Sequence, residues 1–234
     1  MKLRISCLVL LFPLSVCAGE NGGVAEQNFE AGAEYDQDRD SSGYGLNGAY
    51  RLPIAEYFGA SLSASAARTN GQDNRIDTDS GSVVTSVFVR DFDIGKVGIL
   101  YNYTYTKLKL GYGFDDVSIN QNSYGASGQY YLGNFTLFGS RIISKAEDFD
   151  NFNVWFLGVQ AYLPYDVSVS GSAGGMDAED NYSVSAEYQP AFLNQSTSIE
   201  LGYSKSPHND SFQLQVNYFF GTNVSLKQRD RQYR

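Results

Sequence analysis

The sequence contains very little cysteine, and the positions of the cysteines exclude an exported protein that is stabilised by disulfide bonds. The two cysteines, Cys7 and Cys17, both lie in the first 17 of the 234 residues. We expect this stretch to be removed, which leaves no thiol and no disulfide in the mature chain. An exported chain without cross-links has to gain its stability from backbone pairing.

Long hydrophobic runs are also absent after residue 18. No stretch approaches the roughly 20 apolar residues that a membrane-spanning helix needs. The mean hydropathy of −0.31 has the value expected of a water-soluble protein. A membrane β-barrel gives the same value, because its strands are apolar on one face only.

Positive charge is scarce. The chain has 17 Lys and Arg against 26 Asp and Glu, a formal net charge of −9. Removal of Lys2 and Arg4 leaves 15 basic residues against the same 26 acidic ones, which gives −11. Nucleic acid is excluded as a partner, because its phosphates require Lys and Arg.

The first 18 residues are typical of a secretory signal peptide. A basic start, Met1 to Arg4, precedes the apolar core Cys7–Leu14, and small residues end at Ala18. Cys17 opens the alternative of a lipoprotein, but Val16 stands where such signals usually have Gly or Ala. Residues 1–18 are therefore predicted to direct export, and residues 19–27 form a flexible lead-in.

The stretch Ser211–Gly221, S-F-Q-L-Q-V-N-Y-F-F-G, alternates with a period of two. One face of such a strand is apolar and the other polar, because successive side chains point to opposite sides. The apolar face carries Phe212, Leu214, Val216, Tyr218 and Phe220.

Similar alternating segments of about ten residues fill the range 28–221, which predicts about twelve strands, with ten to fourteen as the range. The links alternate between longer acidic segments and short turns, and the apolar faces often begin or end in Tyr, Phe or Trp. Both features favour an all-β, antiparallel, up-and-down transmembrane barrel. A secreted β-sandwich or a lipocalin-like barrel is the alternative.

At this point the sequence resembles small porin-like β-barrel proteins of the Gram-negative outer membrane. The resemblance covers nearly all of the mature chain, and its most specific part is Phe212–Phe220, which is similar to the terminal strand that the barrel-assembly machinery recognises. It implies an outer-membrane location, contact with membrane lipids and lipopolysaccharide, and the barrel-assembly machinery as a partner. Such strands usually end the protein, whereas residues 222–234 continue here as a basic tail, which we expect on the periplasmic side.

The polar faces of the predicted strands supply candidates for the lining of the lumen. They mix both signs of charge with amides, and opposed rows of Arg and Glu would sort solutes by charge. The predicted lumen residues are Glu30, Glu34, Arg51, Arg68, Arg90, Asn102, Gln129, Gln160, Glu187, Glu200, Gln213, Gln215 and Asn217.

No constellation predicts catalysis, a metal site or a cofactor. His208 lies in one short loop with Ser206 and Asp210, whereas catalytic partners normally converge from separate segments. The acidic segments at 36–40 and 177–180 lack the glycine and the closing Glu of a calcium loop, so solvated loops are favoured.

Three functions remain, in decreasing order of support. A passive channel for small hydrophilic solutes follows from the polar lumen face. A non-conducting structural or surface-interaction barrel follows if the charged lumen residues pair with one another and fill the interior, and a twelve-strand barrel lies near the border between the two. A barrel-embedded enzyme is the least supported.

Overall fold

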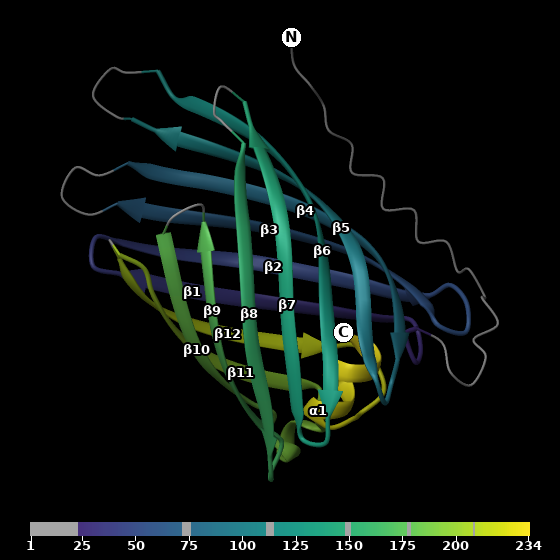
Figure 1. Ribbon diagram of the computed structural model, residues 1–234. Helices are drawn as coiled ribbons and strands as arrows, with labels where there is room; N and C mark the ends of the chain where they lie inside the picture. The colour runs from purple at the N-terminus through teal and green to yellow at the C-terminus, as the bar shows by residue number, and fades with distance from the viewer. Residues whose placement is uncertain (1–22, 72–75, 111–114, 148–150, 177–178, 208) are drawn as a thin grey trace.

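The chain folds into a closed β-barrel, seen in a computed structural model that describes residues 23–71, 76–110, 115–147, 151–176, 179–207 and 209–234 (Figure 1). The predicted signal peptide and His208 lie outside these ranges. Within the ranges, no helix has both the length and the apolar character needed to cross a bilayer.

Twelve antiparallel strands make up the wall, which confirms the predicted fold class and strand number. Each strand pairs with its neighbours in the sequence, and β1 closes the ring by pairing with β12. The strands are β1 Asn28–Asp38, β2 Ser41–Pro53, β3 Phe58–Gly71, β4 Asp77–Asp91, β5 Gly95–Lys109, β6 Val117–Leu132, β7 Phe135–Ala146, β8 Phe152–Leu163, β9 Val167–Met176, β10 Glu179–Tyr188, β11 Thr197–Lys205 and β12 Asp210–Phe219.

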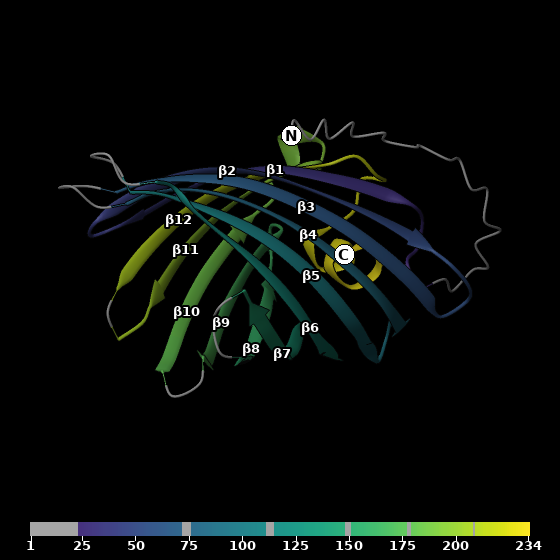
Figure 2. The ribbon, with the colours of Figure 1, turned by 90° about the horizontal axis from the view of Figure 1, so that it is seen from above.

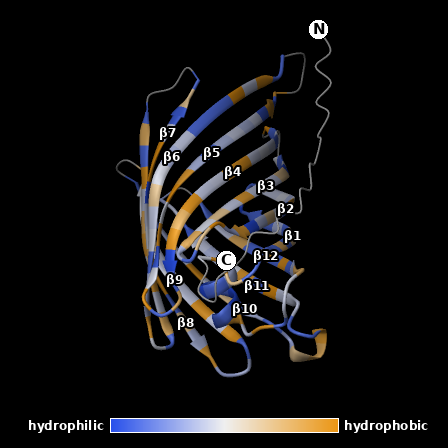
Figure 3. Cartoon of the chain, turned by 90° about the vertical axis from the view of Figure 1, so that its right-hand side faces the viewer, coloured by the Kyte–Doolittle hydropathy of each residue, from blue (hydrophilic) through white to orange (hydrophobic). Residues whose placement is uncertain are grey.

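The apolar side chains point out of the barrel. Leu46, Ile99 and Leu201 are each more than 60% exposed, and they alternate along their strands with residues that face the interior. Hydrophobic and hydrophilic residues accordingly alternate along the strands in Figure 3. A soluble domain would bury these side chains, so the outer face is suited to contact with lipid.

The two ends of the barrel differ. One end, here called the turn end, carries the links 54–57, 92–94, 133–134, 164–166 and 189–196. These are stabilised locally: the Asp91 side chain accepts hydrogen bonds from the backbone N–H groups of Asp93 and Ile94, and Gly133 adopts a φ of 55°. The opposite end, here called the loop end, carries the remaining links.

The wall extends further at the loop end than the sequence pattern predicts. The acidic segment 36–40 was expected to form a solvated loop, but β1 and β2 extend into it and leave only Arg39 and Asp40 between the strands. The Asp38 carboxylate accepts from the Asp40 N–H at 2.7 Å and from the Ser41 hydroxyl at 2.8 Å. A side chain that could have been a free metal ligand instead closes a tight turn.

After β12 the chain turns back into the turn end of the barrel. Residues 222–234, here called the tail segment, contain the short helix α1 (Leu226–Gln228) and one turn of wider helix, η2 (Arg229–Tyr233). Figure 2 shows this segment inside the arch of the strands. The sequence predicted a basic tail on the periplasmic side, and the structure places this segment within the turn end of the barrel.

Candidate functional site

The interior of the turn end is lined by charged and polar side chains from β1, β10, β11 and β12. Glu30 and Glu187 are each 5% exposed, and Ser198 is fully buried. They face inward because each alternates with an outward apolar residue, such as Phe29 or Ile199. The barrel wall therefore presents two carboxylates to whatever occupies this end.

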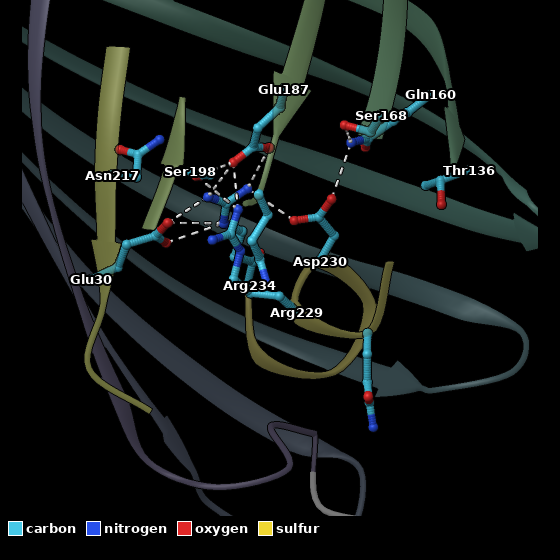
Figure 4. A network of polar contacts seen from close by, with 12 residues as sticks. Glu30, Thr136, Gln160, Ser168, Glu187, Ser198, Asn217, Arg229, Asp230 and Arg234 are labelled. Atoms are coloured by element: carbon cyan, nitrogen blue, oxygen red, sulfur yellow. Dashed lines mark hydrogen bonds and ion pairs between the residues drawn. The ribbon is translucent and has the colours of Figure 1, made fainter. Parts of the chain in front are cut away.

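The tail segment supplies the arginines that pair with these carboxylates (Figure 4). The Arg229 guanidinium binds the Glu187 carboxylate and donates to the Ser198 hydroxyl at 3.1 Å. Arg234 binds Glu30, and its Nη1 donates to Glu187 Oε2 at 3.2 Å and to Asp230 Oδ1 at 2.9 Å. One compact network thus joins the tail segment to β1 and β10.

The network is balanced in charge. Its three carboxylates belong to Glu30, Glu187 and Asp230, and its three guanidinium groups belong to Arg229, Arg234 and Arg51, which donates to Glu30 at 3.2 Å. Buried ions are stable only when they are paired, and removal of one partner from such a set costs about 3–5 kcal/mol. The pairing therefore holds the tail segment firmly in place.

The protonation of the tail segment follows from this environment. Burial alone would lower the pKa of Arg234, but the carboxylates of Glu187, Glu30 and Asp230 raise it well above its ordinary value. Burial raises the pKa of Asp230, and the Arg234 guanidinium acts in the opposite direction. Arg234 is consequently charged whenever the tail segment occupies the barrel.

A second set of contacts fixes the other side of the tail segment. The Arg231 guanidinium lies 4.7 Å from the ring centre of Tyr131 and 5.4 Å from that of Tyr162, and it donates to the Phe135 carbonyl at 2.6 Å. Asp230 accepts from Gln160 Nε2 at 3.0 Å. The tail segment is therefore anchored on β6, β7 and β8 as well as on β1 and β10.

Apolar side chains pack beside the ion-pair network at the turn end. The rings of Phe219 and Tyr233 meet edge to face at 5.6 Å, and Val224 packs in the same cluster. Leu226 is 1% exposed. These apolar side chains therefore add to the polar contacts that hold the tail segment.

The lumen remains open beyond the tail segment. A cavity of about 590 Å³, here called the lumen cavity, is lined by hydroxyl and amide groups of Ser170, Ser185 and Gln213 and by the Glu200 carboxylate. A smaller cavity of about 240 Å³ shares Glu200 and reaches Arg234. Arg234 therefore forms the floor of a polar, water-accessible interior.

Most of the predicted lumen residues have the orientation that the sequence pattern predicted. Glu34 accepts from Gln213 at 3.4 Å, and Gln215 donates to Asn217 at 2.8 Å, all inside the barrel. Except for Arg68, each predicted residue lies on the inner face of its strand: Glu30, Glu34, Arg51, Arg90, Asn102, Gln129, Gln160, Glu187, Glu200, Gln213, Gln215 and Asn217.

Arg68 lies on the outer face instead. It has the same parity along β3 as Leu62 and Ala64, and it stands opposite Tyr44 of β2 and Asp79 of β4. Its Nε lies 3.7 Å from the Asp79 carboxylate, and both side chains are exposed. A strand with a strict period of two cannot bring this residue inward.

The predicted terminal strand has its five apolar residues on the outer face. Phe212 and Phe220 are 63% and 58% exposed, and Tyr218 packs against Phe220 with ring centres 4.5 Å apart. The strand closes the barrel through its register with β1, in which Leu214 stands opposite Tyr35.

The sequence pattern did not identify the tail segment as part of the interior. Two signals were available: the segment is rich in Arg, and Glu30 and Glu187 are carboxylates on inner faces that need counter-ions. Phe88 was a third signal of a filled interior, because it is an apolar residue on the mostly polar face of β4. It points inward, where it is 6% exposed.

No protein-family model matches the sequence, and no curated protein matches it. Solved structures do match in fold, and three of them are described next.

The translocator domain of the autotransporter NalP from Neisseria meningitidis aligns with a TM-score of 0.58 and 16% identity, covering 82% of this chain and 88% of that chain. The KdgM porin in complex with disordered oligogalacturonate aligns with a TM-score of 0.62 and 9% identity, covering 82% and 99%. The COG4313 outer membrane channel from Pseudomonas putida F1 aligns with a TM-score of 0.58 and 11% identity, covering 88% and 100%. The chain has the fold of bacterial outer-membrane β-barrel proteins.

Proposed function

We propose that the protein resides in the outer membrane and acts as a passive channel for small hydrophilic solutes, narrowed at its turn end by the tail segment. The observation that carries this proposal is the lumen cavity of about 590 Å³, whose lining combines polar groups with aromatic and aliphatic side chains. Hydroxyl, amide and carboxylate groups line it, as expected of a water-filled passage. Phe138 and Phe156 are inward-facing aromatic residues beside it, with ring centres 6.1 Å apart.

The outer face supports the proposed location. Its exposed Leu, Val, Ile and aromatic side chains suit contact with outer-membrane lipids and lipopolysaccharide. The strand Asp210–Phe219 supports the barrel-assembly machinery as a partner during insertion. In this arrangement the turn end faces the periplasm and the loop end faces outward.

A non-conducting barrel is the second candidate, and the tail segment is the observation that favours it. Residues 224, 226, 229, 231 and 233 are buried, and they lie in the interior of the turn end. The tail segment is held by buried ion pairs and hydrogen bonds, and the lumen cavity of about 590 Å³ lies beyond it. We therefore rank the channel first.

Planar-bilayer recordings on two purified proteins test the proposal: the full chain and a chain that ends after Gly221. Stepwise conductance from the full chain supports a channel, and conductance from the shortened chain alone supports a channel that the tail segment closes. Two silent proteins overturn the channel and leave the non-conducting barrel. Heat-modifiable gel migration of both proteins ensures that silence is measured on folded barrels.

A further inference from the structure

Two aromatic side chains inside the barrel border the lumen cavity. Phe138 of β7 and Phe156 of β8 occupy inward positions, because each alternates with an outward residue such as Leu137 or Leu157. Both line the lumen cavity. Phe156 is 38% exposed, whereas the inward Phe88 is only 6% exposed. A ring that is left open to a mostly polar interior is an apolar surface available for contact with a solute.

Glycines in the neighbouring strands give these rings their positions. The Phe138 ring lies across Gly158, its register partner on β8, where a Cβ atom would come within 2.4 Å of the ring. At Gly174 of β9 a Cβ atom would lie 3.0 Å from the Cβ of Phe156. The two rings meet at an interplanar angle of 62°, with their centres 6.1 Å apart. The Phe138 ring therefore lies along the wall, and the cavity opens beside it.

Small hydroxyl side chains continue the wall on the next two strands. Ser172 of β9 follows Gly158 in the register, and its Oγ lies 2.7 Å from that of Ser183 on β10. Ser170 and Ser185 form a second pair at 2.9 Å. In the Ser172–Ser183 pair one hydroxyl donates to the other, which leaves one O–H donor and free lone pairs beside the cavity.

Acceptor groups lie on the other side of the same cavity. Glu200 of β11, Gln213 of β12 and Asp36 of β1 line it, and Gln213 stands directly opposite Asp36. Neither Glu200 nor Asp36 lies within ion-pair distance of a Lys or Arg among the described residues. A carboxylate has about four lone-pair positions, so both groups can accept hydrogen bonds from a solute.

The cavity thus combines aromatic faces, hydroxyl groups that donate and accept, and negatively charged acceptors. A sugar ring has the matching surfaces, because its C–H bonds form an apolar face and its hydroxyl groups form a polar rim. An acidic sugar fits poorly, because its carboxylate would be repelled by Glu200 and Asp36. An organic cation would suit the rings and the carboxylates, but it would leave the serine hydroxyls without ligand partners.

We propose that the lumen cavity binds an uncharged saccharide, which stacks on Phe156 and Phe138 and places its hydroxyl groups against Glu200, Gln213 and the serine pairs. The proposal deepens the proposed channel function, on which it rests for the route by which the sugar enters and leaves, by naming the class of solute. None of the described residues that line this cavity belongs to the tail segment. Binding therefore requires no movement of the tail segment.

Calorimetric titration of the purified full chain tests the site, in a detergent without a sugar head group. The probes are maltotriose and cellotriose, which differ in the geometry of their linkages. Three further probes separate the contributions to binding. Sorbitol has hydroxyl groups without a ring face, the same trisaccharides with one ring oxidised to its uronic acid add a negative charge, and choline is an organic cation.

The expected result is binding of at least one trisaccharide, with the uronic-acid form and sorbitol each weaker by about tenfold or more. Absence of binding of both trisaccharides overturns the site. Sorbitol binding as tight as that of the trisaccharides overturns the stacking role of the rings. Choline binding tighter than that of either trisaccharide identifies an organic-cation site and overturns the proposal.

Substitution of the exposed ring shows where the sugar lies. Phe156→Ala is expected to weaken trisaccharide binding by about tenfold, and Phe156→Tyr, which keeps the ring, is expected to preserve it. The matched control is Phe192→Ala, because Phe192 is 81% exposed in the link after β10 and does not line the cavity. Unchanged binding in Phe156→Ala, or equal loss in Phe192→Ala, contradicts the site. Heat-modifiable gel migration establishes that each variant is folded.

A second variant tests the acidic side of the cavity independently of the rings. Glu200→Gln removes one negative charge and keeps an amide that can bind hydroxyl groups. The affinity for the uronic-acid form is expected to rise toward that for the uncharged trisaccharide. An unchanged difference between the two sugars contradicts the role given to Glu200 in excluding acidic sugars.

Planar-bilayer recordings with added trisaccharide keep the two proposals apart. The sugar is expected to reduce the current through the unchanged protein and through Phe192→Ala, and to have little effect on Phe156→Ala. Silent barrels that bind the trisaccharide through Phe156 refute the channel and leave the site intact. Conducting barrels whose current and calorimetry show no response to either trisaccharide refute the site and leave the channel intact.

Discussion

The Arg229 guanidinium forms a buried ion pair with the Glu187 carboxylate, although 42 positions separate them in the sequence. Ser198 binds both partners, because its hydroxyl donates to Glu187 at 2.6 Å and accepts from Arg229 at 3.1 Å. This arrangement joins the tail segment to the wall of the barrel.

Replacement of Glu187 by Gln is expected to loosen the tail segment. The substitution removes the carboxylate that pairs with Arg229 and weakens the hold on Arg234, a change worth about 3–5 kcal/mol when a buried pair is broken. Trypsin should then cut after Arg229 and Arg231 much faster, as mass spectrometry of the released peptides would measure. Glu200→Gln is the matched control, and equally fast cleavage in it would contradict the assignment.

Arg51 and Arg68 should respond in opposite ways to replacement by Gln. Arg51 is partly buried against Glu30, so its loss leaves that carboxylate paired with Arg234 and without Arg51, and should lower the thermal midpoint. Arg68 forms an exposed pair with Asp79 on the outer face, where ion pairs contribute little. Heat-modifiable migration measured against temperature would separate them, and a larger drop for Arg68→Gln would show that the faces are misassigned.

An arginine placed on the lipid-facing side should be far more costly than one placed in the lumen. Leu201 is 61% exposed in the middle of β11, and Leu201→Arg is expected to destabilise insertion by about 2–4 kcal/mol. Gln213→Arg should change little, because it faces the lumen beside Glu34. Urea titrations of folding into lipid vesicles measure both, and equal costs would contradict the outward orientation of Leu201.

The Phe88 ring has its space because Gly59, which lies against it, carries no side chain. In Gly59→Ala the new methyl group would lie 2.5 Å from the ring and 2.9 Å from a Val24 methyl, so we expect a loss of about 1–3 kcal/mol from overpacking. Gly81→Ala meets nothing closer than 3.6 Å and should be nearly neutral. The same urea titration compares the stabilities of the two variants. An unchanged stability of Gly59→Ala would contradict the prediction and show that the Phe88 ring can move aside.

The barrel itself was predictable from the sequence, because alternation with a period of two is a local property. The alternation of Val97, Ile99 and Tyr101 within one strand predicts an outer face, and no information from any other strand is needed. The prediction was wrong at Arg68. The alternation along β3 places this residue on the same outer face as Leu62. The expectation that a charged residue faces the lumen conflicted with that alternation. The strand ends at 36–43 were missed because polar residues pair as well as apolar ones in a long hairpin.

The position of the tail segment could not be read in the same way. Its contacts join residues from one end of the barrel sequence to the other, as in the hydrogen bond from the Asn28 side chain to the Tyr233 carbonyl at 3.2 Å. Such contacts exist only after the ring of strands has closed. Charge complementarity suggests partners for Arg229 and Arg234, but it does not choose between Glu30, Glu187 and the acidic residues elsewhere.

This dependence on closure ties the docking of the tail segment to a finished barrel. Arg234 contacts Glu30 across a sequence separation of 204 residues, and the same segment touches β1, β6, β7, β8 and β10. Those surfaces are all in place only when β1 has met β12, so the complete set of contacts exists only in the closed barrel. A docked tail segment is therefore a built-in signature of a completed barrel, and its protection from protease reports how many molecules have finished assembly.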